Sequence, residues 1–246
     1  MAVSSVKLVS FSGIDGAGKS TQIDALCQLL QNSGLKFSLF TFWDDVVVLA
    51  RFRERASLKA FKGDRGVGSP EKPIARRDKN VRSWYLTAIR LCFYLLDTFS
   101  LCSLIARNAD SNVDFIILDR YIYDELANLP LQSWVMRFYL RVLLLFIPKP
   151  DVALLLDAEP EAATLRKPEY PLKFVRQNRD AYLRLSRFVG MTVVPPLPIE
   201  QAAEFVRSAV SQTCLQEHAE RTPVALSYAL STESAKTSSP GNVPTG

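Results

Sequence analysis

Short apolar runs rich in β-branched residues alternate along this chain with longer segments that gather their apolar residues on one helical face. Candidate strands are residues 6–11, 36–42, 113–119, 150–157 and 191–194. Between the first two runs, an amphipathic helix that stops at Gly34 gathers its apolar residues on one face: Ile23, Leu26, Leu29 and Leu30. Strands that alternate with helices in this way are typical of a parallel sheet covered by helices. The pattern therefore predicts an α/β fold.

The size and composition of the chain favour one folded domain with an anionic ligand. With 246 residues, 48% of them hydrophobic, the chain can bury one ordinary core and carry a small lid, which excludes a disordered adaptor. The 30 lysines and arginines against 25 acidic residues suit nucleotides, and we expect no nucleic-acid partner from so mild an excess. The cysteines are far apart and there is 1 histidine, so we expect reduced cysteines and no zinc.

Two long apolar segments raise the question of a membrane. Residues 84–106 contain Arg90 and Asp97, and residues 134–148 contain Arg137 and Arg141 and are shorter than the roughly 20 residues that a span needs. Buried helices therefore explain both segments better than membrane spans do. The N-terminal residues lack the long apolar core of a signal peptide, so we expect a cytoplasmic protein without a membrane partner.

Two other segments differ in composition from the rest. Residues 51–82 are rich in arginine and lysine and are interrupted by glycines and prolines. This composition fits a mobile excursion over an anionic site, and it fits a solvated basic loop equally well. Residues 212–246 hold too few large apolar residues to fold, so we expect a disordered tail after a domain that spans residues 1–211.

The most specific motif lies between the first strand and the first helix. Gly13, Gly18, Lys19 and Ser20 complete the pattern G-x-x-x-x-G-K-[ST], in which backbone N–H groups and a helix N-terminus converge on phosphate oxygens. Lys19 would reach the β- and γ-phosphates of ATP, and the Ser20 hydroxyl would ligate Mg²⁺. The predicted phosphate-binding residues are Gly13, Asp15, Gly16, Ala17, Gly18, Lys19, Ser20 and Thr21. The alternative is a chance glycine-rich turn, and the absence of an N-K-x-D motif disfavours a GTPase.

A second constellation follows the third candidate strand, which ends in Asp119 and Arg120. Both side chains then lie at the carboxyl edge of the sheet, where open parallel sheets bind ligands. Asp119 can serve Mg²⁺ through water, and the Arg120 guanidinium can bind a phosphate with two hydrogen bonds. An ion pair that caps the strand is the structural alternative.

These motifs resemble those of the thymidylate kinase family of P-loop nucleoside monophosphate kinases. The likeness rests on "FSGIDGAGKSTQ", "ILDRY", "PDVALLLDAEPEAATLR" and "FVRQNRDAYLRL", which follow the family's order between about residues 7 and 190. The resemblance implies a P-loop NTPase sandwich of three layers, with a parallel sheet of about five strands and a small lid at about residues 164–180. It also implies transfer of the γ-phosphoryl group of ATP to a nucleoside monophosphate with Mg²⁺. A homodimer through the apolar helix around residues 94–105 is a further implication, although that face could equally be core.

Residue by residue, the resemblance assigns catalytic roles to Lys19, Asp15, Arg120, Arg166 and Arg176. Asp15 matches an acidic position that faces the acceptor's sugar and the metal. Gly16 stands where some members have an arginine, and in other members cations of the lid supply that charge. Arg166 is the first candidate for this cation and Arg176 the second, with Lys167, Lys173 and Arg179 nearby; solvated helix surface is the alternative for each.

The acceptor half departs from the family pattern. Tyr94 stands where an aromatic residue stacks on the base, but Thr98 replaces the arginine that grips the acceptor phosphate. Arg120 together with Arg51 or Arg53 would replace that clamp. The predicted acceptor-binding residues are Tyr94, Arg120, Asp124, Glu125 and Arg51. The departures leave three functions open: a monophosphate kinase, a kinase for a nucleoside or another small acceptor, and a nucleotide-binding regulatory protein without catalysis.

Overall fold

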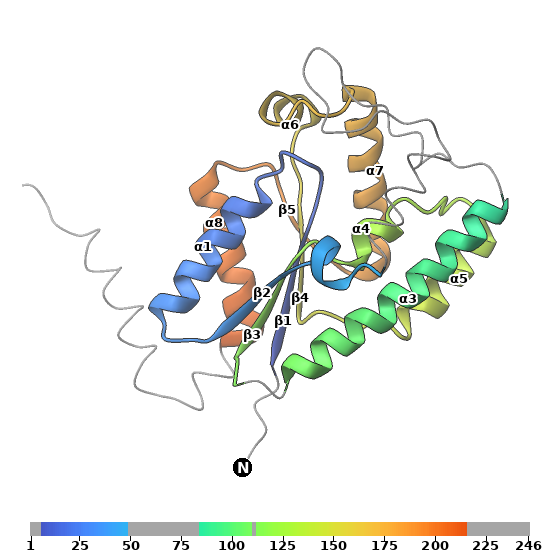
Figure 1. Ribbon diagram of the computed structural model, residues 1–246. Coiled ribbons are helices and arrows are strands. Elements are labelled where there is room, and N and C mark those ends of the chain that lie inside the picture. Colours follow the sequence, from blue (N-terminus) through green and yellow to red (C-terminus); the bar gives the residue numbers. More distant parts are fainter. Residues whose placement is uncertain (1–5, 49–83, 110–111, 216–246) are drawn as a thin grey trace, which may run out of the picture.

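The computed structural model describes residues 6–48, 84–109 and 112–215, and its centre is a five-stranded, all-parallel sheet (Figure 1). The strands are β1 (Lys7–Ser12), β2 (Phe37–Thr41), β3 (Phe115–Asp119), β4 (Val152–Leu156) and β5 (Thr192–Val194). Their order across the sheet is β2-β3-β1-β4-β5, and every neighbouring pair is parallel. The sheet predicted from the apolar runs is therefore confirmed, with strands that begin or end one or two residues away from the predicted bounds.

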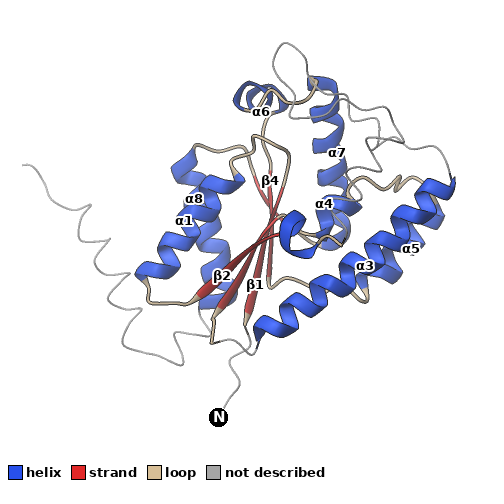
Figure 2. Cartoon of the chain, viewed as in Figure 1, coloured by secondary structure: helices blue, strands red, loops and turns tan. Residues whose placement is uncertain are grey.

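Helices cover both faces of this sheet (Figure 2). The described helices are α1 (Lys19–Asn32), α3 (Trp84–Ala109), α4 (Ile122–Leu126), α5 (Trp134–Leu144), α6 (Pro160–Arg166), α7 (Leu172–Val189) and α8 (Ile199–Val210). Two short π-helices, η1 (Phe42–Val46) and η3 (Ser211–Leu215), complete the described elements. Helices α1 and α8 lie on one face, and α3, α4, α5 and α7 lie on the other.

The strands alternate their side chains between two hydrophobic cores. Val9 and Ile117 pack with the residues of α1 and α8, whereas Leu8, Ile116 and Leu118 pack with the residues of α3, α4 and α7. All residues of β1 and the first four of β3 are buried, because helices exclude water from both faces. A parallel sheet that is covered on both sides explains why these strands read as nearly continuous apolar runs. Because all the strands are parallel, their carboxyl ends lie at one common edge of the sheet.

The long apolar helix α3 is buried on one side only. Its residues Ile89–Ala109 are long and apolar enough to cross a membrane, but the core helices of soluble proteins also pass this test of length and composition. Tyr94 and Leu101 are fully buried, and Asp97 accepts a hydrogen bond from the backbone N–H of Val48 at 2.9 Å. On the opposite side Phe99 is 76% exposed. The prediction of a buried helix therefore holds for one face of α3 and is wrong for the other.

Some sequence-based predictions concern residues that the structure does not describe. The basic excursion at 51–82, including Arg51 and Arg53, lies entirely outside the described residues. The helical end of the domain continues through η3 to residue 215, a few residues into the segment predicted to be a tail. Residues 216–246 lie outside the described residues.

Candidate functional site

The loop between β1 and α1 has a backbone that glycine alone accommodates easily. Gly13, Gly16 and Gly18 have φ angles of 142°, 81° and 87°, in the left-handed half of backbone space. A Cβ atom on Gly13 would lie 2.5 Å from the carbonyl oxygen of Leu156, and one on Gly16 would lie 2.4 Å from that of Ala163. The loop is therefore pressed against the end of β4 and against α6.

Helix α1 begins directly after this loop and presents an uncapped N-terminus. Gly18 is its N-cap, no side chain caps the helix, and its first turn contains no acidic residue. The first N–H groups of a helix have no partners within it, and its dipole favours an anion at this end. Ser20 and Thr21 are exposed in the same turn. This end of α1 is therefore suited to a phosphate group.

A cavity of about 730 Å³ opens at this position, at the carboxyl ends of β1, β3, β4 and β5. Its polar side is formed by residues 15–22, Asp119, Arg120, Asp157, Glu159, Arg166 and Lys167. Its apolar side is formed by Val194, Pro195, Pro196, Leu197, Pro198, Ile199 and Ala202. The volume is in the range of small-molecule sites, about 300–1,000 Å³. One end of the cavity therefore suits phosphates and the other suits a flat apolar group.

Lys19 folds back onto the loop that precedes it. Its ammonium group donates hydrogen bonds to the carbonyl oxygens of Gly13 and Ile14, each at 2.9 Å. Burial, followed by repulsion from Arg120, lowers the pKa of Lys19 from 10.5 to about 8. Lys19 is thus a desolvated cation at the phosphate end of the cavity.

Arg120 links the end of β3 to the glycine-rich loop. Its φ angle of 68° is left-handed, which is uncommon for a residue with a side chain, and its backbone N–H donates to Phe11 at 2.9 Å. Nη1 donates to Asp124 Oδ1 at 3.1 Å, and Nη2 donates to Asp15 Oδ1. Burial works against the charge, but the carboxylates, Asp124 foremost, raise the pKa of Arg120 above its ordinary value. The ion pairs make Arg120 a permanently charged group in a fixed place.

Asp124 is buried, with an exposure of 4%, and it accepts four hydrogen bonds. Its donors are the hydroxyls of Ser12 and Tyr182, the guanidinium of Arg120 and the backbone N–H of Tyr121. The prediction that Asp124 contacts an acceptor therefore does not fit this arrangement, because both carboxylate oxygens already face protein donors.

Asp119 lines the cavity and has one carboxylate oxygen without a hydrogen-bond partner. It ends β3, and its Oδ1 is buried without a hydrogen-bond partner. Buried carboxylate oxygens without partners are rare and call for an explanation such as a water or an ion. Among the described residues no group of three or more His, Cys, Asp or Glu forms a ready metal site. A cation at Asp119 would therefore need further oxygen ligands, such as the Ser20 hydroxyl and phosphates.

The candidate lid cations separate into two groups. Arg166 and Lys167 line the cavity. Arg176 is exposed and pairs with Glu161 on α6, away from the cavity lining. Arg179 donates two hydrogen bonds of 2.7 Å to Asp157 and further bonds to Glu159, which raise its pKa. Of the two preferred candidates, the structure brings Arg166 to the site and leaves Arg176 on the surface.

The predicted base-stacking residue lies in the core. Tyr94 is 0% exposed, and its hydroxyl donates to the carbonyl oxygen of Glu125 at 3.3 Å. Thr98 is also buried, and its hydroxyl donates to the carbonyl oxygen of Tyr94 at 2.7 Å. In this arrangement Tyr94 has no free face for a base. Glu125 is partly exposed, and Arg51 lies outside the described residues.

Several site residues were not predicted from the sequence. Asp157 and Glu159 follow β4 and line the cavity. The signal was available, because an aspartate stands directly after β4, much as Asp119 stands at the end of β3. The proline-rich wall at 195–198 carried no recognisable motif. Ser12 and Tyr182, whose hydroxyls donate to Asp124, lie in two of the motifs that carry the family resemblance, but the sequence analysis gave them no role.

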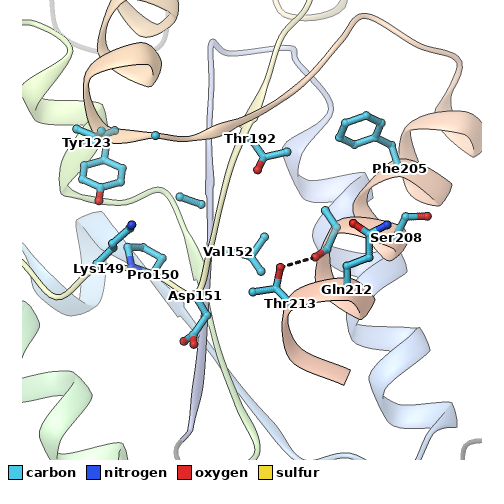
Figure 3. Close-up of a pocket in the computed structure, with 14 residues that line it drawn as sticks. Tyr123, Lys149, Pro150, Asp151, Val152, Thr192, Phe205, Ser208, Gln212 and Thr213 are labelled. Carbon is cyan, nitrogen blue, oxygen red and sulfur yellow. Dashed lines mark hydrogen bonds between the residues drawn. The ribbon is translucent and has the colours of Figure 1, made fainter. Parts of the chain in front are cut away.

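A second cavity of about 380 Å³ lies where β4 and β5 begin, at the opposite edge of the sheet (Figure 3). Asp151, Val152 and Thr192 line it together with the end of α8. None of the residues predicted to bind ATP or an acceptor is among its lining residues. The candidate site is therefore the larger cavity at the carboxyl edge.

Comparison with known proteins gives one distant relationship. No family model matches the chain. The chain is 25% identical over 214 residues to a probable thymidylate kinase from Archaeoglobus fulgidus, a match that covers 82% of this chain and 94% of that protein. The chain is thus distantly related to a protein described as a kinase, along nearly the whole length of that relative.

Proposed function

We propose that this chain is an ATP-dependent kinase that transfers the γ-phosphoryl group of Mg-ATP to a nucleoside monophosphate. The observation that carries the proposal is the convergence of the glycine-rich loop, Lys19, Asp119 and Arg120 on one cavity at the carboxyl edge of the sheet. The distant relationship to a probable thymidylate kinase supports the same class of reaction.

In this proposal the loop is a P-loop that holds the phosphates of ATP. The backbone of residues 13–18 and the N-terminus of α1 bind the phosphate oxygens, with Ser20 and Thr21 beside them. Lys19 leaves the carbonyls of Gly13 and Ile14 for the β- and γ-phosphates. The apolar wall at Val194–Ile199 receives the base.

The residues at the cavity also fit Mg²⁺. The unpartnered Oδ1 of Asp119 and the Ser20 hydroxyl are oxygen donors, the kind that Mg²⁺ prefers, and the phosphates would complete its shell. When bound, the ion would supply positive charge that neutralises the transferring phosphoryl group.

In the reaction an oxygen of the acceptor phosphate bonds to the γ-phosphorus as the bond to the β-bridging oxygen breaks, which releases ADP. Lys19 and Arg166 stabilise the charge on the migrating group, and Arg120 turns from Asp15 toward the acceptor phosphate. An arginine positioned at the transferring phosphoryl group, the role of Arg166 in this proposal, contributes on the order of 10³ to 10⁵ in rate. Asp15, once released, faces the acceptor's sugar.

A second candidate acceptor is a nucleoside, whose hydroxyl carries no charge. Two observations favour it: Thr98 is buried where the family has a phosphate-binding arginine, and Arg120 already pairs with two carboxylates. Either acceptor uses the same ATP site.

A coupled assay of ADP release tests the proposal with a panel of nucleoside monophosphates and nucleosides, alongside Lys19→Ala. We expect turnover with a monophosphate and its loss in a folded Lys19→Ala protein, because Lys19 supplies charge to the phosphoryl group and no apolar contact to the core. Turnover with nucleosides alone would select the second candidate. Tight ATP binding without turnover would indicate a regulatory protein, and an active Lys19→Ala variant would refute the assigned phosphate site.

A further inference from the structure

The network around Asp124 joins three parts of the fold at one carboxylate. Ser12, at the end of β1, donates to Oδ2 at 2.6 Å, and the backbone N–H of Tyr121 donates to the same oxygen at 3.1 Å. Tyr182, in α7, donates to Oδ1 at 2.7 Å, and Arg120 Nη1 donates to Oδ1 at 3.1 Å. Arg120 and Tyr182 therefore share one oxygen atom.

The environment of this carboxylate leaves few alternative positions for Arg120. A buried charge is stable only with a good partner and hydrogen bonds to its remaining lone pairs. Asp124 has both, because the hydroxyls of Ser12 and Tyr182 are themselves buried and face it. The carboxylate is thus held from several sides, and it in turn fixes one edge of the Arg120 guanidinium.

Helix α7 reaches the site through two side chains on the same face. Tyr182 donates to Asp124, and Arg179, three residues earlier, donates to Asp157 and Glu159 after β4. Residues three apart lie on one side of a helix. The first half of α7 belongs to the segment predicted to be the lid, at about residues 164–180, so a displacement of α7 along its axis would pull on Asp124 and on the residues after β4 together.

We infer that Asp124 and Tyr182 are positioning residues that set the orientation of Arg120, and that Tyr182 makes this orientation depend on the position of α7. The inference rests on the proposed function in one respect only, the role of Arg120 toward an acceptor phosphate. The link from Tyr182 through Asp124 to Arg120 is independent of it.

Tyr182→Phe tests the inference, because it removes one hydroxyl and keeps the ring. Tyr139→Phe is the matched control: the Tyr139 hydroxyl donates to the carbonyl oxygen of Leu91 at 2.8 Å, between α5 and α3 and outside the cavity lining. We expect Tyr182→Phe to lower kcat/KM for the acceptor by about tenfold, the size of one hydrogen bond to a charged group, with an unchanged Kd for ATP. Tyr139→Phe should leave both constants as in the parent protein.

A measurement without turnover separates this inference from the proposed function. In NMR spectra of isotope-labelled protein, the guanidinium N–H signals of Arg120, assigned by their loss in Arg120→Lys, should shift and exchange faster in Tyr182→Phe and stay unchanged in Tyr139→Phe. That response in a protein that turns over no acceptor would support the positioning role and refute the kinase proposal. Unchanged Arg120 signals in Tyr182→Phe would overturn the positioning role, whatever the activity.

Asp124→Asn provides a second variant if Tyr182→Phe does not fold. The amide keeps the shape of the side chain and removes its charge. Of the two carboxylates that pair with Arg120, only Asp15 then remains. We expect the same NMR response, with a larger rise of KM for the acceptor than of KM for ATP. Equal changes of both KM values with unaltered Arg120 signals would show a structural role alone.

Discussion

The guanidinium of Arg120 donates a hydrogen bond to the carboxylate of Asp15 across 105 residues of sequence, and so joins the end of β3 to the glycine-rich loop. The same guanidinium reaches the buried Asp124 on its other side. Arg120 is therefore the shared partner of a loop carboxylate at the cavity and a carboxylate in the core. Removal of the Arg120 side chain should affect ligand binding at the cavity, because Asp15 loses its partner. It should also affect stability, because the buried Asp124 loses its cation.

We expect Arg120→Ala to lower the melting temperature clearly, because it leaves Asp124 buried without its cation. Breaking a buried pair by removing one partner costs about 3–5 kcal/mol, whereas neutralising both partners costs less. The double variant Arg120→Ala/Asp124→Asn should therefore be more stable than Arg120→Ala alone. A double-mutant cycle from denaturant unfolding gives the coupling. Additive losses would show that the two side chains do not stabilise one another.

ATP binding should weaken as the pH rises above about 8, where Lys19 loses its proton in the free protein. Stability should change in the opposite sense. The folded-state pKa lies below the ordinary 10.5, so the unfolded chain binds more protons in this interval and the free energy of unfolding rises from pH 8 toward 10.5. Titration of ATP affinity and of the unfolding midpoint against pH checks both trends. In Lys19→Met both pH dependences should disappear. A pH dependence that persists in this variant would have to arise from another titratable group.

Gly16→Ala should destabilise the protein more than Gly18→Ala does. Both glycines have left-handed φ angles, 81° and 87°, so both alanines bear similar backbone strain. Only at Gly16 does the new Cβ meet a backbone atom, Ala163 O at 2.4 Å, whereas nothing lies within 4 Å at Gly18. We expect a difference of about 1–3 kcal/mol in the free energy of unfolding without ligand, the usual effect of overpacking. Equal losses of stability in the two variants would mean that α6 moves away from the new Cβ atom at little cost.

The exposed side of α3 should support a homodimer, as the family resemblance implies. Leu95, Leu96 and Phe99 form an exposed apolar stripe, and Phe99 has the largest exposed fraction of the three. Such a stripe is typical of a surface that another chain covers. Light scattering should give a dimer mass for the parent protein and a monomer mass for Phe99→Lys. Leu165→Lys is the control, since Leu165 is 85% exposed on α6, and a monomeric parent would refute the dimer.

The sheet, and the residues that lie at the carboxyl ends of its strands, could be predicted from the sequence. Apolar runs such as that of β3 are set by burial on both faces, and a motif that follows such a run must lie at the carboxyl edge. This reasoning placed Lys19, Asp119 and Arg120 at one cavity. It needed only local pattern and the geometry of parallel strands.

The sequence was not sufficient for Asp124 and Tyr94. A carboxylate near a predicted site is expected to be exposed, and the burial of Asp124 depends on donors that local pattern does not reveal. An aromatic residue on an apolar helix faces either a ligand or the core, and periodicity does not distinguish the two. The core position of Tyr94 follows from the way α3 packs against α4.

The two hydroxyls that donate hydrogen bonds to Asp124 belong to Ser12, 112 residues before it, and to Tyr182, 58 residues after it. During synthesis the chain emerges from the ribosome in order, so β1, β3 and α4 are available well before α7. Until then the carboxylate has no Tyr182, and Arg120 is held by Asp15 and the incomplete network alone. Contacts of such long sequence separation form late in folding. A nascent chain arrested before residue 182 should therefore contain the glycine-rich loop while Arg120 is still free to reorient. Because the apolar wall at 194–199 is synthesised later still, such a chain should bind ATP only weakly, and the complete ATP site should form after Arg120 has gained its full network.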